Sequence, residues 1–192
     1  MRNLLSYSCV LLTALVLAAC SRSDTGTPNP ATNATSEKGR INLGDGRVSF
    51  VPPPNLKQLT KEQIAASKFG GEKPADYVFS NDPQTVTIGV VLNFIELAPD
   101  QLEDYIDANR RLLSMTVQDV QFLAHELVTI NGRGWVHFEI VSEVPEVNLH
   151  NHQYTTSFYG GALVFGFNST VREYEQYKNE FLKSAQSIVV RD

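Results

Sequence analysis

The chain has 192 residues, with 16 basic and 21 acidic side chains and a formal net charge of −5 at neutral pH. An acidic protein without a basic cluster is a poor match for nucleic acid, so we expect no nucleic-acid partner. About 150 residues remain after the N-terminal segments described next, which is the length of one ordinary domain and enough to bury a core.

The first 19 residues have the pattern of a secretory signal peptide. Arg2 supplies a positive charge, and an apolar run from Val10 to Leu17 follows it. This run is shorter than the roughly 20 apolar residues that a membrane-spanning helix needs. The stretch Leu17-Ala18-Ala19-Cys20 resembles the lipobox of bacterial lipoproteins. The alternatives are an ordinary signal peptide with an incidental cysteine, or an uncleaved apolar anchor.

The lipobox resemblance implies where the protein is held. In that class the chain is cut before Cys20, and acyl groups on its sulfur and new amine anchor the protein, since several acyl chains together bind a bilayer firmly. Ser21 stands where an aspartate would favour the inner membrane, so we expect the outer membrane, facing the periplasm. Cys9 leaves with the signal peptide and Cys20 is acylated, so no thiol remains for a disulfide.

Residues 20–40 are predicted to be a disordered tether behind the lipidated cysteine. They are rich in Ser, Thr, Asn, Pro and Gly and contain no aromatic or large aliphatic residue, so they cannot bury apolar surface. A flexible segment of this length reaches roughly 25 Å from the membrane. Residues 41–192 are predicted to form a single α+β domain.

The domain is predicted to open with a hairpin and a short helix. Residues 41–43 and 48–51 flank Gly44-Asp45-Gly46, which suits a tight turn because these residues tolerate positive φ. Thr60 can cap a helix over residues 61–68.

A central strand and a long helix are predicted next. Residues 77–79 and 85–95 have strand character, and in the longer run the alternate residues from Val86 to Phe94 share one face. A helix is predicted to begin at Pro99 and to run to about Val117, because its apolar residues follow helical spacing. Its carboxylates and arginines lie on the opposite face, which indicates solvated surface charge rather than paired catalytic acids.

Two further hairpins and a final helix complete the domain. Asn131-Gly132 joins strands over residues 123–130 and 133–144, and Gly160-Gly161 joins strands over 154–159 and 162–167. Thr170 can cap a last amphipathic helix. We therefore predict an α+β fold in which hairpins build an antiparallel β-sheet with two main α-helices packed on it.

Several of these segments resemble the PsbP-like superfamily, which includes DcrB-type envelope lipoproteins. The resemblance covers roughly residues 41–190 and is carried by Phe50-Val51-Pro52-Pro53, Val128–Trp135, Tyr154–Tyr159 and Tyr174–Phe181. It implies a sheet with helices on its face and, for most members, no enzymatic activity. Members act as assembly factors, adaptors or chaperone-like binders.

Three histidines and a glutamate are candidates for a metal site. His150 and His152 are two residues apart, so in a strand they point the same way, and His137 and Glu139 alternate likewise. Imidazoles with a carboxylate suit zinc or copper. However, the segment 143–152 contains a proline and two asparagines, which is typical of an exposed polar connection, and the spacing matches no recognised zinc motif. We therefore assign no cofactor, and the four residues stay candidates.

No catalytic residue is predicted. His125-Glu126 begins like a metalloprotease motif, but Thr129 stands where the second histidine would be, and the segment is predicted to be a strand. The sequence contains no G-x-S-x-G elbow. Trp135, Phe158 and Tyr159 could line a ligand pocket, or could pack in the core and hairpins as aromatic strand residues commonly do. We expect a protein that is not an enzyme.

The predicted function is that of a membrane-anchored envelope lipoprotein, held in the bilayer by acylated Cys20, whose domain binds an envelope protein partner as an adaptor or assembly module. The alternative is a lipoprotein that binds a small molecule or a metal ion, zinc or copper.

Overall fold

The computed structural model describes residues 38–67, 74–144 and 147–191. The predicted signal peptide, the lipobox cysteine Cys20 and nearly all of the tether lie outside the described residues. The strands are β1 (Ile41–Leu43), β2 (Val48–Phe50), β3 (Lys57–Gln58), β4 (Tyr77–Ser80), β5 (Val86–Val91), β6 (Gln121–Ile130), β7 (Arg133–Val144), β8 (Val147–Phe158), β9 (Gly161–Thr170) and β10 (Val189–Val190). The helices are α1 (Lys61–Ala66), α2 (Leu102–Thr116) and α3 (Val171–Gln186), and a 3₁₀ turn over Pro99–Gln101 leads into α2.

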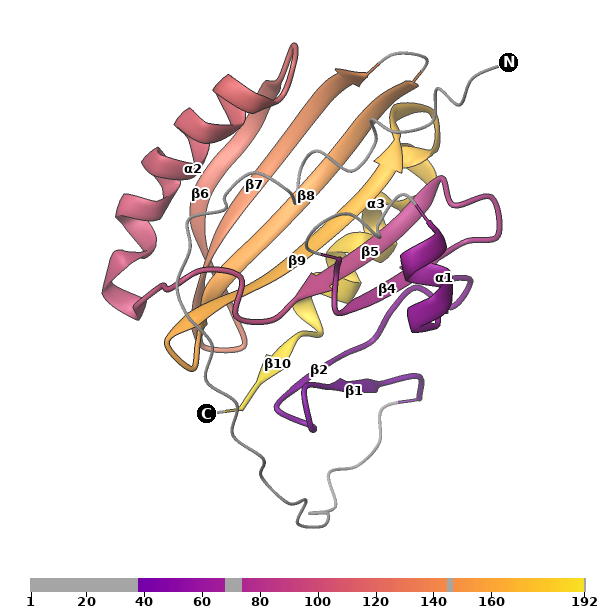
Figure 1. Cartoon of the computed structure of the whole chain (residues 1–192), viewed down its shortest axis with the longest axis horizontal. Coiled ribbons are helices and arrows are strands. Elements are labelled where there is room, and N and C mark those ends of the chain that lie inside the picture. Colours follow the sequence, from indigo (N-terminus) through magenta and orange to yellow (C-terminus); the bar gives the residue numbers. More distant parts are fainter. Residues whose placement is uncertain (1–37, 68–73, 145–146, 192) are drawn as a thin grey trace.

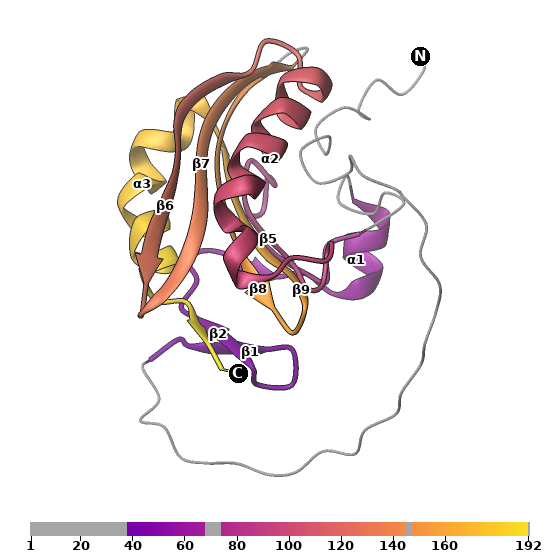
Figure 2. The ribbon, with the colours of Figure 1, turned by 90° about the vertical axis from the view of Figure 1, so that its left-hand side faces the viewer.

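Seven antiparallel strands form the main sheet, in the order β3-β4-β5-β9-β8-β7-β6 (Figure 1). Helix α2 covers one face and α3 covers the other, so the sheet is the middle layer (Figure 2). Strands β1, β2 and β10 form a smaller sheet beside the end of α3. The predicted α+β class, with an antiparallel hairpin sheet and two main helices, is confirmed. No helix of the described residues is long and apolar enough to span a membrane.

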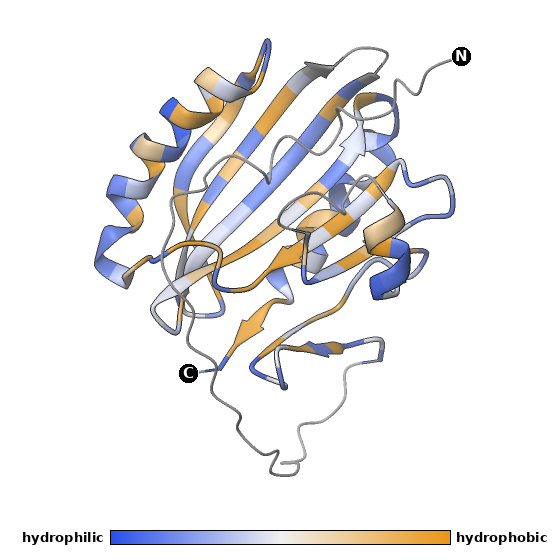
Figure 3. Ribbon diagram, in the orientation of Figure 1, coloured by the Kyte–Doolittle hydropathy of each residue, from blue (hydrophilic) through white to orange (hydrophobic). Residues whose placement is uncertain are grey.

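Each face of the sheet has its own apolar core, because side chains alternate along a strand. Hydrophobic and hydrophilic residues accordingly follow one another along the long strands (Figure 3). The core under α3 includes Phe50, Phe79, Ile88, Trp135, Phe165, Phe167, Phe181 and Ile188. The core under α2 includes Val91, Leu102, Leu113, Val136, Phe138, Ile140 and Val164. Val136 and Phe138 therefore pack in the core under α2, while the residues between and beside them face α3.

The turn between β8 and β9 lies one residue earlier than predicted: Tyr159 and Gly160, with φ of 50° and 79°, form it, and Gly161 begins β9. The Asn131-Gly132 turn forms as predicted. Asn131 and Gly132 both adopt positive φ, 49° and 80°, which is the conformation that matches the twist of a two-residue hairpin. This turn sets the register of β6 against β7, with Ile130 opposite Arg133. The helix α1 begins after Thr60, whose side chain accepts a hydrogen bond from the backbone N–H of Gln63.

The central strand is shorter than predicted. β5 ends at Val91, and Asn93 adopts a φ of 53°, which turns the chain. As a result Leu92 packs in the core under α3, whereas Phe94 packs in the core under α2. The prediction that Phe94 shares a face with Val86 is wrong, because the alternation of a strand ends where its φ changes sign.

Helix α3 is tied down at its C-terminal end. The amide of Asn131 donates to the carbonyl oxygens of Gln186 and Ile188, at 3.0 and 2.8 Å. The Ser187 hydroxyl oxygen accepts from the backbone N–H of Val51 at 2.8 Å. These bonds join the helix end to the β6–β7 turn and to the strand pair at the start of the domain. At the other end, Thr170 caps the helix.

Candidate functional site

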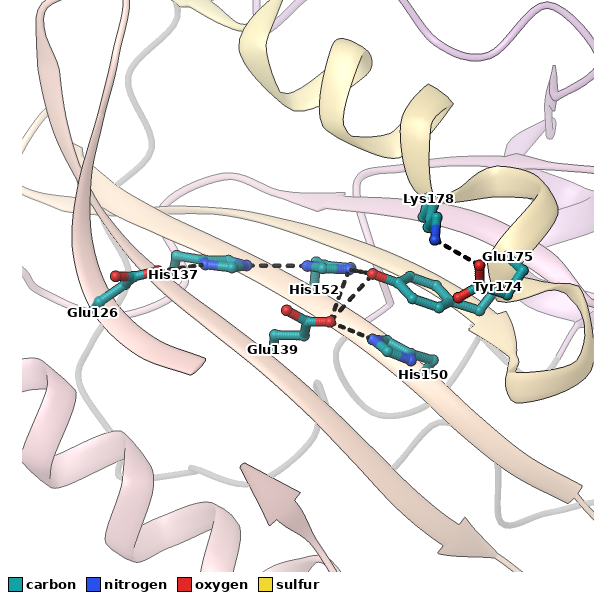
Figure 4. A network of polar contacts seen from close by, with 8 residues as sticks. All are labelled: Glu126, His137, Glu139, His150, His152, Tyr174, Glu175 and Lys178. Carbon is teal, nitrogen blue, oxygen red and sulfur yellow. Dashed lines mark hydrogen bonds and ion pairs between the residues drawn. The ribbon is translucent and has the colours of Figure 1, made fainter. Parts of the chain in front are cut away.

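The β7–β8 hairpin brings the four candidate residues together on the α3 face of the sheet (Figure 4). In its register, Glu139 lies opposite His152, and Val141 lies opposite His150. His137 is two residues from Glu139 on β7, so it shares their face. We call Glu139, His150 and His152, with His137 beside them, the histidine cluster.

The prediction of an exposed polar connection over residues 143–152 is wrong for its second half. Strand β8 begins at Val147, and His150 is only 5% exposed. The asparagines of this segment signal a turn, but β8 pairs with β7 on one side and with β9 on the other, so its polar residues are enclosed. Asn151 is buried, and its side-chain amide has no hydrogen-bond partner among the described residues.

Short polar contacts connect the cluster. Glu139 Oε1 lies 2.7 Å from His150 Nε2 and 3.8 Å from His152 Nε2. His152 Nδ1 lies 3.0 Å from His137 Nε2. The phenol of Tyr174, in the first turn of α3, lies 2.9 Å from His152 Nε2 and donates to Glu139 Oε1 at 3.2 Å.

Aromatic stacking fixes the planes of the rings. The His137 ring lies on Tyr154, with centroids 4.5 Å apart and planes 15° apart. The His150 ring lies on Tyr174 at an interplanar angle of 11°. Because each imidazole is held by a ring and by a hydrogen bond, its nitrogen atoms have fixed directions.

Burial and hydrogen bonding shift the pKa values of Glu139, His137 and His152. Burial disfavours the charged imidazolium, which lowers the pKa of His152 to about 4 against the opposing effect of Glu139, and it also lowers the pKa of His137. Burial alone would raise the pKa of Glu139, but the hydrogen bond from His150 and its other partners hold it below the ordinary value. Burial and Glu139 raise the pKa of Tyr174. At neutral pH an ionised carboxylate thus lies beside uncharged His137 and His152.

Two residues of the site were not predicted from the sequence to belong to it. Tyr174 belongs to the apolar stripe of the last helix by spacing, and only the packing of α3 on β8 brings its phenol to the cluster. Glu126 attracts notice only through its neighbour His125; in the structure its Oε1 lies 3.7 Å from His137 Nδ1. His125 itself stacks on Phe138, on the α2 side of the sheet.

The aromatic residues considered for a pocket have separate environments. Trp135 and Phe158 are buried in the core under α3, as packing predicts. Tyr159 is 54% exposed and lies under the guanidinium of Arg47, 4.4 Å from its ring centre. Trp135 also borders a hollow beside Ile188, and its indole N–H has no hydrogen-bond partner among the described residues.

Comparison with known proteins connects this architecture to one fold. No family model and no curated protein matches the sequence. Among solved structures, the chain is similar to the cyanobacterial PsbP protein (CyanoP) of Synechocystis sp. PCC 6803, with a TM-score of 0.53, 15% identity, and coverage of 84% of this chain and 98% of that chain. The fold is PsbP-like. The chain is also similar to LpqN of Mycobacterium tuberculosis, with a TM-score of 0.55, 12% identity, and coverage of 80% and 90%. The predicted PsbP-like fold is therefore confirmed.

Proposed function

We propose that this protein is a lipid-anchored, non-catalytic module of the bacterial envelope, whose PsbP-like domain binds an extended segment of a partner protein along the edge strand β6. The observation that carries the proposal is the edge itself. Within the described residues, β6 is the last strand of the main sheet and pairs only with β7. The outer side of such a strand presents backbone N–H and C=O groups that a second chain can pair with.

The side chains of β6 suit a protein partner. Leu123 is 53% exposed and Leu127 is 42% exposed, although large apolar side chains are usually buried. Leu127 also borders a hollow of about 460 Å³ between β6 and the start of α2, lined in part by Pro99 and Leu102. Strand pairing would supply affinity, and the apolar side chains beside it would select the partner's residues.

One feature of β6 limits where a partner can pair. A bulge between Phe122 and Ala124 interrupts the register, and bulges are a common protection of sheet edges. From Ala124 to Ile130 the pairing with β7 is regular. We therefore place the partner strand along residues 124–130.

A site-specific crosslinking experiment tests this edge. A photoreactive amino acid at Thr129 should give one reproducible crosslinked partner in cells, and Leu127→Lys should reduce its yield, because both positions are exposed and lie within residues 124–130. The matched control is Leu182→Lys on α3, which is 50% exposed but lies on another surface. Crosslinks that persist in Leu127→Lys, or that are equally lost in the control, would contradict binding along β6.

The envelope location is supported by the lipobox resemblance of Leu17-Ala18-Ala19-Cys20 and by the similarity of fold to LpqN, which is described as involved in cell envelope biogenesis. We propose the same setting here, on the periplasmic side of the outer membrane. Cys20→Ala should move the protein from the membrane fraction to the soluble fraction, because the acyl anchor would be lost. A variant that stays fully membrane-bound would contradict the anchor without affecting the β6 experiment.

A further inference from the structure

The histidine cluster has a geometry that protein binding at β6 does not require. Glu139, His150 and His152 each offer one ligand atom, and these three atoms all lie within 4.8 Å of one another. They come from adjacent strands of the sheet rather than from mobile loops, so their positions are set by the hairpin register. Rigid elements hold a site more accurately than loops do.

The two distances from Glu139 to the imidazole nitrogens lie close to those around a tetrahedral metal ion. Zinc binds nitrogen and carboxylate oxygen at about 2.0–2.2 Å, so two of its ligands lie about 3.3 Å apart. The carboxylate oxygen of Glu139 is 2.7 Å from His150 Nε2 and 3.8 Å from His152 Nε2. Shifts of about half an ångström in either direction would make both distances equal to the tetrahedral one.

Tyr174 lies where the fourth ligand of the ion would be. The phenol oxygen of Tyr174 is 2.9 Å from His152 Nε2 and 3.2 Å from Glu139 Oε1. It can act as a ligand or hold a water molecule in that place. Since Tyr174 belongs to α3, an ion in the cluster would bridge the helix to β7 and β8 (Figure 4).

His137 and Glu126 support the ligand role of His152. Its Nδ1 lies 3.0 Å from His137 Nε2, and His137 Nδ1 in turn lies 3.7 Å from a carboxylate oxygen of Glu126. Metal-binding histidines almost always donate their second ring N–H to a carboxylate, a backbone carbonyl or water, which fixes the tautomer and leaves the other nitrogen for the metal. Here the nitrogen of His137 takes the place of that acceptor. The chain from Glu126 through His137 therefore directs Nε2 of His152 toward Glu139.

We propose that Glu139, His150 and His152 bind one divalent transition-metal ion, zinc or copper(II), with Tyr174 at the fourth position and His137 as a positioning residue. Two imidazoles, a carboxylate and a phenol oxygen form a ligand set of the nitrogen and oxygen type that these ions prefer. The side chains of His150 and His152 are 7% and 13% exposed, while that of Glu139 is 23% exposed, so the ion would enter past the carboxylate.

The test is calorimetric titration of the full, tag-free chain with zinc and with copper(II). Both cysteines, Cys9 and Cys20, are replaced by serine so that no thiol competes for the ion. We expect one ion per chain. Glu139→Gln keeps the size of the side chain but removes its charge. It should weaken binding by more than the roughly 10- to 100-fold that is typical when a residue that only orients a ligand is replaced.

The fourth histidine supplies a matched control. His125 lies on the other side of the sheet, so His125→Ala should bind like the parent chain. His137→Gln should weaken binding by about 10- to 100-fold, because His137 orients the ligand His152 without binding the ion itself. Electron paramagnetic resonance of the copper(II) form should show coupling to two imidazole nitrogens, one of which is lost in His150→Ala. Circular dichroism checks that each variant is folded.

Three results would overturn the site: no binding to the folded parent chain, undiminished binding to folded Glu139→Gln, or an equal loss in His125→Ala. The first two would identify the cluster as a hydrogen-bonded network only. Because each of these experiments measures metal binding directly, their outcomes are independent of whether β6 binds a partner.

Discussion

As the pH falls, the metal-free domain should lose stability at a higher pH than a protein without buried histidines. Protonation of His152 should account for much of this loss. Burial holds its pKa at about 4, whereas the unfolded chain has the ordinary value of 6.5. Between these values the unfolded state binds the proton and the folded state does not, so stability rises with pH in this range. The contribution is complete above pH 6.5 and is lost as the pH falls toward 4. At about 1.4 kcal/mol for each tenfold difference in proton affinity, the loss amounts to about 3 kcal/mol.

Urea denaturation in the presence of EDTA, repeated from above pH 6.5 down to about 4, measures this loss as a fall in the free energy of unfolding. The His152→Gln variant should have a flatter profile, although His137, whose pKa is also lowered by burial, would leave part of the slope. The control Ile88→Val removes one methylene from the core under α3 and should lower stability by about 0.5–1.5 kcal/mol equally at every pH. An unchanged slope in His152→Gln would refute the reasoning that burial of this imidazole resists protonation.

Three further predictions concern the scaffold, each measured as the free energy of unfolding. Phe167→Ala should cost about 3–5 kcal/mol, because the ring is fully buried between the sheet and α3. Gly161→Ala should cost about 1–3 kcal/mol, since the new Cβ would lie 2.9 Å from the Cα of Asn93, whereas Gly134→Ala meets only an ordinary contact and should be tolerated. Thr170→Ala should cost about 1 kcal/mol by removing the cap that accepts from the Glu173 N–H; a cost equal to that of Phe167→Ala would show that more than a cap was lost.

The sequence predicts those elements of the fold that depend on interactions between neighbouring residues. Asn131-Gly132 determines a hairpin because both residues accept positive φ, and Thr170 determines a helix start because its hydroxyl reaches a nearby N–H. Strand β10 could not be predicted in the same way. It has two residues, and its pairing partner is β2, more than a hundred residues earlier. Such a short strand exists only because the end of α3 is fixed beside it.

The candidate site was predictable in its members but not in its environment. The spacing of His150 and His152 indicates a shared face in any strand. Their burial depends on pairing of β8 with β9 across residues such as Asn151 and Asn168, and asparagine-rich segments locally favour turns. Tyr174 enters through the packing of α3, which the helical period of the sequence leaves open. The burial of the histidines and the position of Tyr174 thus depend on tertiary packing, which residue types alone do not reveal.

The bonds at both ends of α3 imply that this helix opens and closes as one piece with its surroundings. Its first turn is held by the Tyr174 contacts to the sheet, and its last turn by Asn131 and by the Ser187 contact to Val51. A helix fixed at one end would fray from the other, whereas this one must release both. Native-state hydrogen exchange should therefore give similar opening free energies for the amides of α3, β10 and β2, as expected of a single cooperative unit. A gradient of protection along α3 would show instead that one end is loose.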